Sequence, residues 1–418
     1  MTSPAGGPNA GPVVQTERID AIDVLRGFAL LGILLMNVQS FAMPQAAYFN
    51  PTAYGDLEGA NLNVWVAVRM LADQKFMTIF SMLFGAGIVL MAGRAEARGD
   101  ARRVHYRRMG WLLVMGLLHA HLLWAGDILF LYAVCGMLVY PLRHQPPGRL
   151  IAMGVGLLAV ASAYSIGSGL SLPYWPEEAR EAFATNAWRP SPEIIEAELA
   201  AMRGGWLDQQ LTRSAGALAF ETLLLITWGL WRAGGLMLIG MALFKRGVFG
   251  AQRTPRFYAA LIAVAVAVGL PLQAYGIALD FERGWPFWSF FIGVQFNYWP
   301  SILVSLGYVG AVMLACRREG LRALTRPFAA VGQTALTNYL LQTVLCTTIF
   351  YGHGLGWFGS VDRVGQIGVV AFVWAVQLVA SPLWLRRFRF GPAEWVWRSL
   401  TYRARPPLRR TPVPASAH

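Results

Sequence analysis

Ten apolar stretches of 16 to 30 residues follow one another along this chain, most of them separated by short segments. An α-helix needs about 20 apolar residues to cross the hydrocarbon core of a bilayer. The stretches cover 24–43, 63–92, 109–125, 127–142, 150–171, 217–244, 257–279, 291–316, 328–350 and 364–385. We therefore expect an all-α, polytopic membrane helix bundle of ten spans, with the lipid bilayer as its main partner.

The composition excludes several other classes of protein. Of the 418 residues, 56% are hydrophobic and 14% are charged, whereas soluble domains average about 25% charged residues. The cysteines Cys135, Cys316 and Cys346 all lie inside apolar runs, which excludes a disulfide scaffold and a Cys-rich zinc site. Walker A, dinucleotide-binding and HExxH motifs are absent from the sequence, and we expect neither a metal nor a permanently bound cofactor.

The basic residues alternate with the apolar stretches in a way that predicts orientation. Segments 94–108, 143–149, 245–256 and 317–326 and the tail from 386 are rich in Arg, whereas 44–62, 172–215, 280–290 and 351–363 are neutral or acidic. Cytoplasmic loops of membrane proteins carry the excess of Lys and Arg. We expect both termini in the cytoplasm, and the net charge of +13 then indicates membrane orientation rather than nucleic-acid binding.

The same pattern divides the chain into six parts. They are a disordered cytoplasmic tail (1–17), a five-span half with a polar cluster (18–171), an extracytoplasmic loop with short helices (172–215), a second five-span half (216–390), an interfacial amphipathic helix (391–403) and a basic disordered tail (404–418). The second span is expected to break near Asp73-Gln74-Lys75.

Polar residues inside the spans are the candidates for function, because ionisable groups are costly in a membrane. With the predicted orientation, five of them share the outer half of the bilayer: Asn37, Lys75, His119, His121 and Asp127. Asp73 accompanies Lys75, and the ninth span adds Asn338 and Gln342 near mid-depth. We expect these side chains from separate helices to meet at one buried site.

Each candidate also has a structural interpretation. His119 and His121 are two residues apart and point to different sides of a helix, so at least one is expected to be a neutral hydrogen-bonding group between helices. Asp127 can equally cap the helix that follows it. Asp73 can pair with Lys75, and the arginines of 94–108 can serve orientation and lipid-phosphate contact alone.

Several motifs carry a resemblance to a known family. They are the run from Arg18 to Asn37 (RIDAIDVLRGFALLGILLMN), Phe80–Gly87 (FSMLFGAG), Gly116–Ala120 (GLLHA), Ala335–Gln342 (ALTNYLLQ) and Trp384–Arg398 (WLRRFRFGPAEWVWR). Over about 18–403 the chain resembles the YeiB-like family of bacterial inner-membrane proteins, long catalogued as a domain of unknown function. The resemblance implies a multi-pass protein of the bacterial inner membrane.

A more distant likeness concerns the first span. Asp23, Arg26-Gly27, Ala29 and Asn37 are similar to the first span of heparan-alpha-glucosaminide N-acetyltransferase and its bacterial relatives. Those enzymes pass an acyl group from cytoplasmic acyl-CoA to a sugar across the membrane. They place a catalytic His in the segment after the first span, whereas 44–75 of this chain contains no His. His119 or His121 would have to take that role.

Three hypotheses follow. In the first, the protein transfers an acyl group from acyl-CoA to an extracytoplasmic sugar or a lipid-linked acceptor. His119 or His121 is then the general base, Asp127 orients it and Asn37 or Lys75 stabilises the oxyanion. Asp73, Lys75, Asn338 and Gln342 are the candidate substrate-binding residues, and Arg102, Arg103, Arg107 and Arg108 attract the phosphates of CoA.

In the second hypothesis, the same polar residues serve a small-solute or lipid transporter. In the third, the chain is a structural factor of the envelope. The sequence leaves the oligomeric state open.

Overall fold

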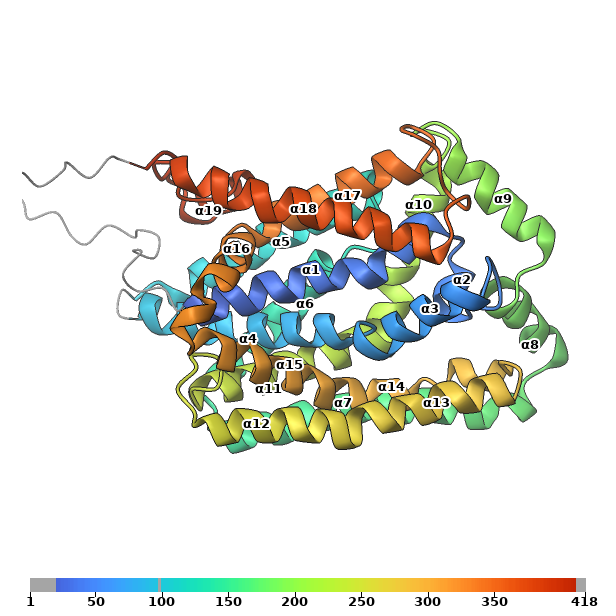
Figure 1. Cartoon of the computed structure of the whole chain (residues 1–418), viewed down its shortest axis with the longest axis horizontal. Coiled ribbons are helices and arrows are strands. Elements are labelled where there is room, and N and C mark those ends of the chain that lie inside the picture. Colours follow the sequence, from blue (N-terminus) through green and yellow to red (C-terminus); the bar gives the residue numbers. More distant parts are fainter. Residues whose placement is uncertain (1–19, 97–98, 411–418) are drawn as a thin grey trace, which may run out of the picture.

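The structure is a computed structural model that describes residues 20–96 and 99–410. Long helices run nearly parallel to one another along the longest axis of the molecule (Figure 1). Within the described residues the chain forms no β-strand beyond one isolated bridge between Phe388 and Arg409. The prediction of an all-α bundle is confirmed.

The first half of the chain contains ten of the labelled helices. They are α1 (Asp20–Ala42), α2 (Ala46–Phe49), α3 (Gly59–Leu71), α4 (Lys75–Glu96), α5 (Ala101–Leu122), α6 (Leu129–Val139), α7 (Pro147–Ser171), α8 (Glu177–Phe183), α9 (Pro192–Arg203) and α10 (Gln210–Ala219). Short 3-10 or π segments extend several of them, of which η5 (Phe220–Gly229) joins α10 to the next helix.

The second half contains the other nine. They are α11 (Leu230–Lys245), α12 (Pro255–Val264), α13 (Leu270–Glu282), α14 (Gln295–Tyr298), α15 (Pro300–Cys316), α16 (Arg322–Gln333), α17 (Ala335–Phe350), α18 (Arg363–Arg387) and α19 (Pro392–Tyr402). Side-chain N-caps mark the start of two of these helices. Thr254 accepts a hydrogen bond from the Phe257 amide before α12, and Asp362 accepts one from the Gly365 amide before α18.

Helix α1 forms the centre of the bundle. In its most apolar window 67% of the residues are buried within the protein, against 28% for α7, 22% for α12 with α13 and 28% for α18. Helices with so many exposed apolar residues fit a lipid environment, so these three segments form the lipid-facing periphery. Figure 1 shows α18 on one side of α1, and α7 and α12 on the other.

Two glycines let α4 and α11 approach each other closely. A Cβ on Gly85 would lie 2.0 Å from the Met237 carbonyl oxygen, and a Cβ on Gly240 would lie 1.9 Å from that of Met82. Close packing of this kind, through small residues, is typical of membrane helices, which lack a hydrophobic drive to associate in lipid. The contact fixes α11, and with it the buried Arg232, against the start of α4.

All ten predicted stretches coincide with helical segments, but their lengths differ. Within residues 20–96 and 99–410, seven segments are long and apolar enough to cross a membrane, and Leu129–His144 and Ala335–Phe350 are shorter apolar helices. The third stretch falls on α5, whose first turns carry several arginines. The protein therefore has several membrane-spanning helices, while the count of ten and the cytoplasmic placement of the termini remain predictions.

The structure also divides stretches that the sequence analysis treats as continuous. The break in the second stretch is confirmed: α3 ends at Leu71, α4 begins at Lys75, and Gln74 between them adopts a φ of +63°. The ninth stretch is divided as well, because Thr334 separates α16 from α17. The predicted tail 1–17 and the end of the basic tail, 411–418, lie outside the described residues.

Candidate functional site

His119 lies in a buried network that we call the His119 network, with Asp127, Thr343 and Tyr339. His119 is 3% exposed; its Nδ1 lies 2.8 Å from Asp127 Oδ1 and its Nε2 lies 2.9 Å from Thr343 Oγ1. The carboxylate accepts, so Nδ1 carries the proton and Nε2 accepts from the threonine hydroxyl. A hydroxyl, an imidazole and a carboxylate in this order have the connectivity of a catalytic triad.

The two oxygens of Asp127 combine both predicted roles. Oδ2 accepts a hydrogen bond of 2.8 Å from the Phe130 amide in the first turn of α6, which is the capping role. Oδ1 contacts His119 and, at 3.5 Å, the Tyr339 hydroxyl, which itself accepts from the Ile128 amide. The cap therefore fixes the carboxylate that orients the imidazole.

His121 points to a different side of α5, as its spacing from His119 predicts. Its Nε2 lies 3.2 Å from Glu221 and its Nδ1 lies 3.5 Å from Ser214. The side chain of His121 is 32% exposed, whereas that of His119 is 1% exposed. The two histidines therefore belong to separate environments.

Asn37 lies on the same face of α1 as Phe41, which contacts Trp124 next to His119. It is half-buried, and its amide has no hydrogen-bond partner in residues 20–96 and 99–410. Leu34 and Phe41 lie three residues before it and four after it, hence on one helix face. Phe41 stacks on Trp124 at 4.2 Å between ring centroids, and Trp124 meets the His119 ring edge-on at 6.4 Å.

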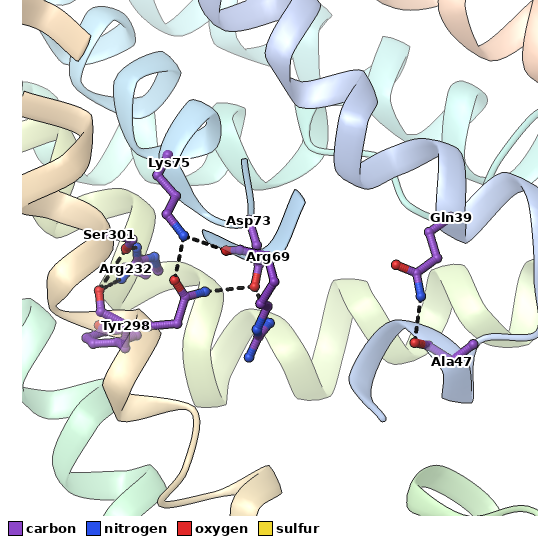
Figure 2. Close-up of polar contacts among 9 residues, drawn as sticks. Gln39, Ala47, Arg69, Asp73, Lys75, Arg232, Tyr298 and Ser301 are labelled. Carbon is purple, nitrogen blue, oxygen red and sulfur yellow. Dashed lines mark hydrogen bonds and ion pairs between the residues drawn. The ribbon is translucent and has the colours of Figure 1, made fainter. Parts of the chain in front are cut away.

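Lys75 and Asp73 belong to a second set of side chains, which we call the Lys75 network: Arg69, Asp73, Lys75, Asn297 and Arg232 (Figure 2). Lys75 is fully buried, and its Nζ donates to Asn297 Oδ1 and to the Arg69 carbonyl, both at 2.8 Å. Asn297 donates in turn to Asp73 Oδ2 at 2.7 Å, and Arg69 forms an ion pair with the same oxygen. Asp73 is thus connected to Lys75 through an amide.

Arg232 completes this network from α11. It is fully buried and donates to the Tyr298 carbonyl at 3.0 Å, to Ser301 at 2.8 Å and to Thr78 at 3.1 Å. Its Nε has no partner in the part of the chain that the structure describes. Its guanidinium lies 4.3 Å from the centroid of the Tyr298 ring. Among the described residues, Asp73 is the one carboxylate within ion-pair distance of Arg69, Lys75 or Arg232. The network therefore carries an excess of positive charge.

Asn338 and Gln342 contribute to a third group that joins α17 to α18 and α1. Asn338 donates to Ser381 and to Thr334, both at 2.9 Å. Gln342 donates to Gln377 at 3.0 Å and to the Leu30 carbonyl at 3.3 Å. Every one of these contacts lies within the protein, which is the pattern of an interhelical hydrogen-bond seam.

The four arginines at the start of α5 differ in their surroundings. Arg102 and Arg103 are exposed, whereas Arg107 and Arg108 are half-buried. The Arg108 guanidinium lies 4.2 Å from the centroid of Trp397 in α19, and the Trp397 indole donates to the Arg108 carbonyl. Arg108 is therefore held by α19, and Arg102 and Arg103 are the pair that is free to meet a soluble anion.

A narrow cleft, partly open to the outside, lies between α1, α3 and α18, at the end of the bundle that carries α2. Its lining includes the charged or amide side chains of Gln39, Arg69, Arg363 and Gln366. Tyr48 and apolar residues such as Val64 and Ile367 also line it. Arg69 connects the cleft to the Lys75 network. The α1 residues that line the cleft are centred on the helix face opposite Asn37. The cleft and the His119 network are therefore on different sides of α1.

The polar residues that were expected to form one buried site therefore lie in separate networks. The structure brings together His119 with Asp127, and Asp73 with Lys75, but it places these two pairs in separate networks. Thr343, Asn297 and Arg363 were missed by sequence reasoning. A threonine or an asparagine on an apolar helix gives no signal of its partner, and Arg363 stands at the predicted end of a loop.

The fold and these networks define a class: a polytopic membrane protein with buried polar and ionic groups between its helices. The chain belongs to the YeiB-like family. It is 33% identical to the uncharacterized protein YeiB of Escherichia coli (strain K12) over 392 residues, covering 94% of this chain and 98% of the relative. It is 29% identical to the uncharacterized protein YxaH of Bacillus subtilis (strain 168) over 419 residues, covering 95% and 97%. Residues 243–404 match the family described as protein of unknown function (DUF418).

Proposed function

We propose that this membrane protein, placed in the bacterial inner membrane, transfers an acyl group from acyl-CoA to an extracytoplasmic or lipid-linked acceptor. The observation that supports this most is His119 held between Asp127 and the Thr343 hydroxyl, at 2.8 and 2.9 Å. Asp127 fixes the tautomer that leaves Nε2 as a base. Thr343 has a second acceptor in the Tyr339 carbonyl at 3.5 Å, so its hydroxyl can turn away and free Nε2.

The proposed step balances as follows. His119 Nε2 removes the proton from an acceptor hydroxyl or amine, whose oxygen or nitrogen attacks the thioester carbonyl. The C–S bond breaks, and the imidazolium returns the proton to the leaving thiolate. Asn37 is the candidate donor to the oxyanion, because its amide has no partner among the described residues and lies on the α1 face of Phe41. Lys75 has no part in this step, because it belongs to the other network.

The test uses full-length protein in lipid nanodiscs that contain phosphatidylethanolamine as an amine acceptor, with acetyl-CoA and palmitoyl-CoA as donors. Release of free thiol is followed, together with acylated lipid. His119→Gln should lower the rate about 100- to 10,000-fold. His121→Gln is the matched control, two residues away, and should keep the rate within about twofold. Equal rates in the two variants would exclude His119 as the base.

The donor site is tested separately. Neutralising Arg102 and Arg103 to Gln should weaken acetyl-CoA binding at least about tenfold, since each phosphate contact is charge-assisted. The control neutralises Arg256 and Arg322, which are exposed in other basic segments. Equal affinity of both double variants for acetyl-CoA would remove the cytoplasmic donor site from the proposal.

A second candidate function, transport of a small solute, is favoured by the Lys75 network at the break between α3 and α4. Binding sites of secondary transporters commonly lie at interrupted helices near mid-membrane. Here Gln74 has a φ of +63° beside the buried Lys75. Uptake of radiolabelled inorganic phosphate and lactate into proteoliposomes tests this, with recovery of the unchanged solute. Uptake that depends on Lys75 supports transport, and its absence for both probes speaks against an anion carrier.

A further inference from the structure

The cleft between α1, α3 and α18 has an unusual balance of charge. Arg69 and Arg363 both line it, and the ion pair of Arg69 is to Asp73. Arg363 is 3% exposed and has no carboxylate within ion-pair distance in the described part of the chain. A buried charge without an opposite partner is costly unless something compensates it. The cleft therefore has a positive charge to be neutralised.

Across residues 20–96 and 99–410, the hydrogen bonds of Arg363 involve only the two terminal nitrogens of its guanidinium. Its terminal nitrogens donate to the carbonyls of Pro51, at 3.0 Å, of Tyr54, at 3.3 Å, and of Asp56. Its Nε is buried and has no hydrogen-bond partner among the described residues. A polar atom that is buried and unpaired costs free energy, which a ligand can recover. Arg363 is thus oriented by backbone carbonyls and incompletely satisfied.

Asp56, whose carboxylate interacts electrostatically with Arg363, forms its hydrogen bonds with other groups. Its oxygens accept from the Asn61 amide, at 2.7 Å, and from the Glu58 backbone N–H, at 2.9 Å. These hydrogen bonds, with the Asn61 bond as the largest effect and the Arg363 charge as a smaller one, lower the pKa of Asp56 below its ordinary value. Asp56 therefore stays ionised at neutral pH and acts on Arg363 only through space, which leaves the guanidinium without a direct counterion.

Two amides add acceptors to the same cleft. Gln39 donates its Nε2 to the Ala47 carbonyl at 2.7 Å, as Figure 2 shows, and Gln366 donates its own to the Val361 carbonyl at 3.1 Å. Neither side-chain oxygen has a donor in residues 20–96 and 99–410. The cleft thus offers cationic donors together with two unused carbonyl acceptors. That combination matches an anion that carries neighbouring hydroxyl groups.

The remaining lining is largely apolar, with Tyr48 as a further polar side chain, and most of the cleft is formed by membrane-spanning segments. Val64, Val68 and Ile367 belong to the stretches Gly59–Gly93 and Arg363–Arg387. Apolar walls next to an anion site at this depth suit the acyl chain of an amphiphile. Arg363, at the first residue of α18, places the headgroup end near the loop 351–363.

We propose that this cleft binds a polyol phosphate headgroup. The phosphate lies between Arg69 and Arg363, and the hydroxyls donate to Gln39 and Gln366. An anionic lipid such as phosphatidylglycerol and free glycerol phosphate both contain a phosphate next to hydroxyl groups. The proposal does not depend on acyl transfer, because every residue in it lies outside the His119 network.

Native mass spectrometry of the full-length protein in detergent provides the test, with phosphatidylglycerol, phosphatidylcholine and glycerol 1-phosphate as probes. We expect phosphatidylglycerol to bind at least tenfold more tightly than phosphatidylcholine. Binding of the lipid with no binding of glycerol 1-phosphate assigns the site to lipid, and binding of both assigns it to the headgroup alone. Equal retention of both lipids together with no binding of glycerol 1-phosphate would overturn the proposal.

Variants separate the cleft from general lipid binding. Arg363→Gln should remove most of the preference for phosphatidylglycerol. Because Arg363 also holds the carbonyls of the loop 51–56, Val64→Phe fills the cleft without a change of charge and should weaken binding at least fivefold. Val379→Phe, at a position 60% exposed on α18, is the matched control and should bind as the natural protein does. An unchanged preference in Val64→Phe would place the lipid elsewhere.

Discussion

The His119 network and the Lys75 network lie on different sides of α1 and solve the burial of polar groups in different ways. In the His119 network a carboxylate, an imidazole and a hydroxyl form a chain in which a proton can move. In the Lys75 network three basic side chains are grouped around one carboxylate and are otherwise held by amides, hydroxyls and carbonyls. The first arrangement suits proton transfer, and the second suits the holding of an anion.

The largest expected effect on the difference between the two networks comes from substitution of Asp127. The amide in Asp127→Asn cannot accept from both His119 Nδ1 and the Phe130 N–H, so His119 is expected to change tautomer and lose its free Nε2. We expect thiol release from acetyl-CoA to fall about 1,000- to 10,000-fold with little change in unfolding temperature. Glu221→Gln, at the carboxylate beside His121, is the control and should retain activity. A comparable loss in both variants contradicts the assignment.

The second effect concerns stability at Asp73. Asp73→Ala leaves Arg69 without its ion pair and the Asn297 amide without its acceptor, inside the protein. We expect a loss of about 3–5 kcal/mol in the free energy of unfolding, measured by denaturant titration in mixed micelles. Asp23→Ala removes a comparable pair, Asp23–Arg26 at 2.7 Å, in which Arg26 is 29% exposed, and should cost about 1 kcal/mol or less. Similar losses would mean that the Lys75 network is not buried as described.

A smaller effect is expected from Arg232. Arg232→Met removes one of the excess cations together with three hydrogen bonds, and the two changes offset each other to within about 2 kcal/mol of unfolding free energy. If the network holds an anion, uptake of radiolabelled phosphate should fall at least tenfold while Arg232→Lys retains part of it. Unchanged uptake in Arg232→Met would show that its charge is only structural.

The smallest effect is a pH dependence at Glu394, which caps α17, the helix of Thr343. Glu394 accepts from the Leu336 amide at 2.6 Å and from the Thr337 hydroxyl at 2.6 Å, yet burial has the larger effect and raises its pKa above 4.5. A raised pKa means that the folded protein binds the proton more tightly. This stabilisation is complete below pH 4.5 and is lost as pH rises through the folded pKa.

Glu394→Gln should therefore flatten the dependence of unfolding temperature on pH between pH 4.5 and neutrality. The exposed Glu319→Gln serves as the control and should leave the dependence unchanged. An identical pH profile in Glu394→Gln and in the natural protein would contradict the effect of burial.

Much of the fold could be predicted because membrane helices are marked by the sequence alone. The break near Gln74, the helix at 392–402 and the opposite directions of His119 and His121 all follow from local composition or helical spacing. The division at Thr334 was missed, because the carboxylate that caps α17 comes from Glu394, 58 residues after Leu336. Such a cap leaves no local pattern.

The candidate site shows the same limit. Helix depth placed Asn37, Lys75 and His119 at one level, but depth does not give the angle at which a helix faces its neighbours. The sequence by itself determined a helical membrane protein and the residues that are costly to bury, since both depend on composition and period. Only the tertiary structure decided that Thr343 meets His119 and that Asn297 joins Lys75 to Asp73, because these contacts depend on how separate helices rotate and pack.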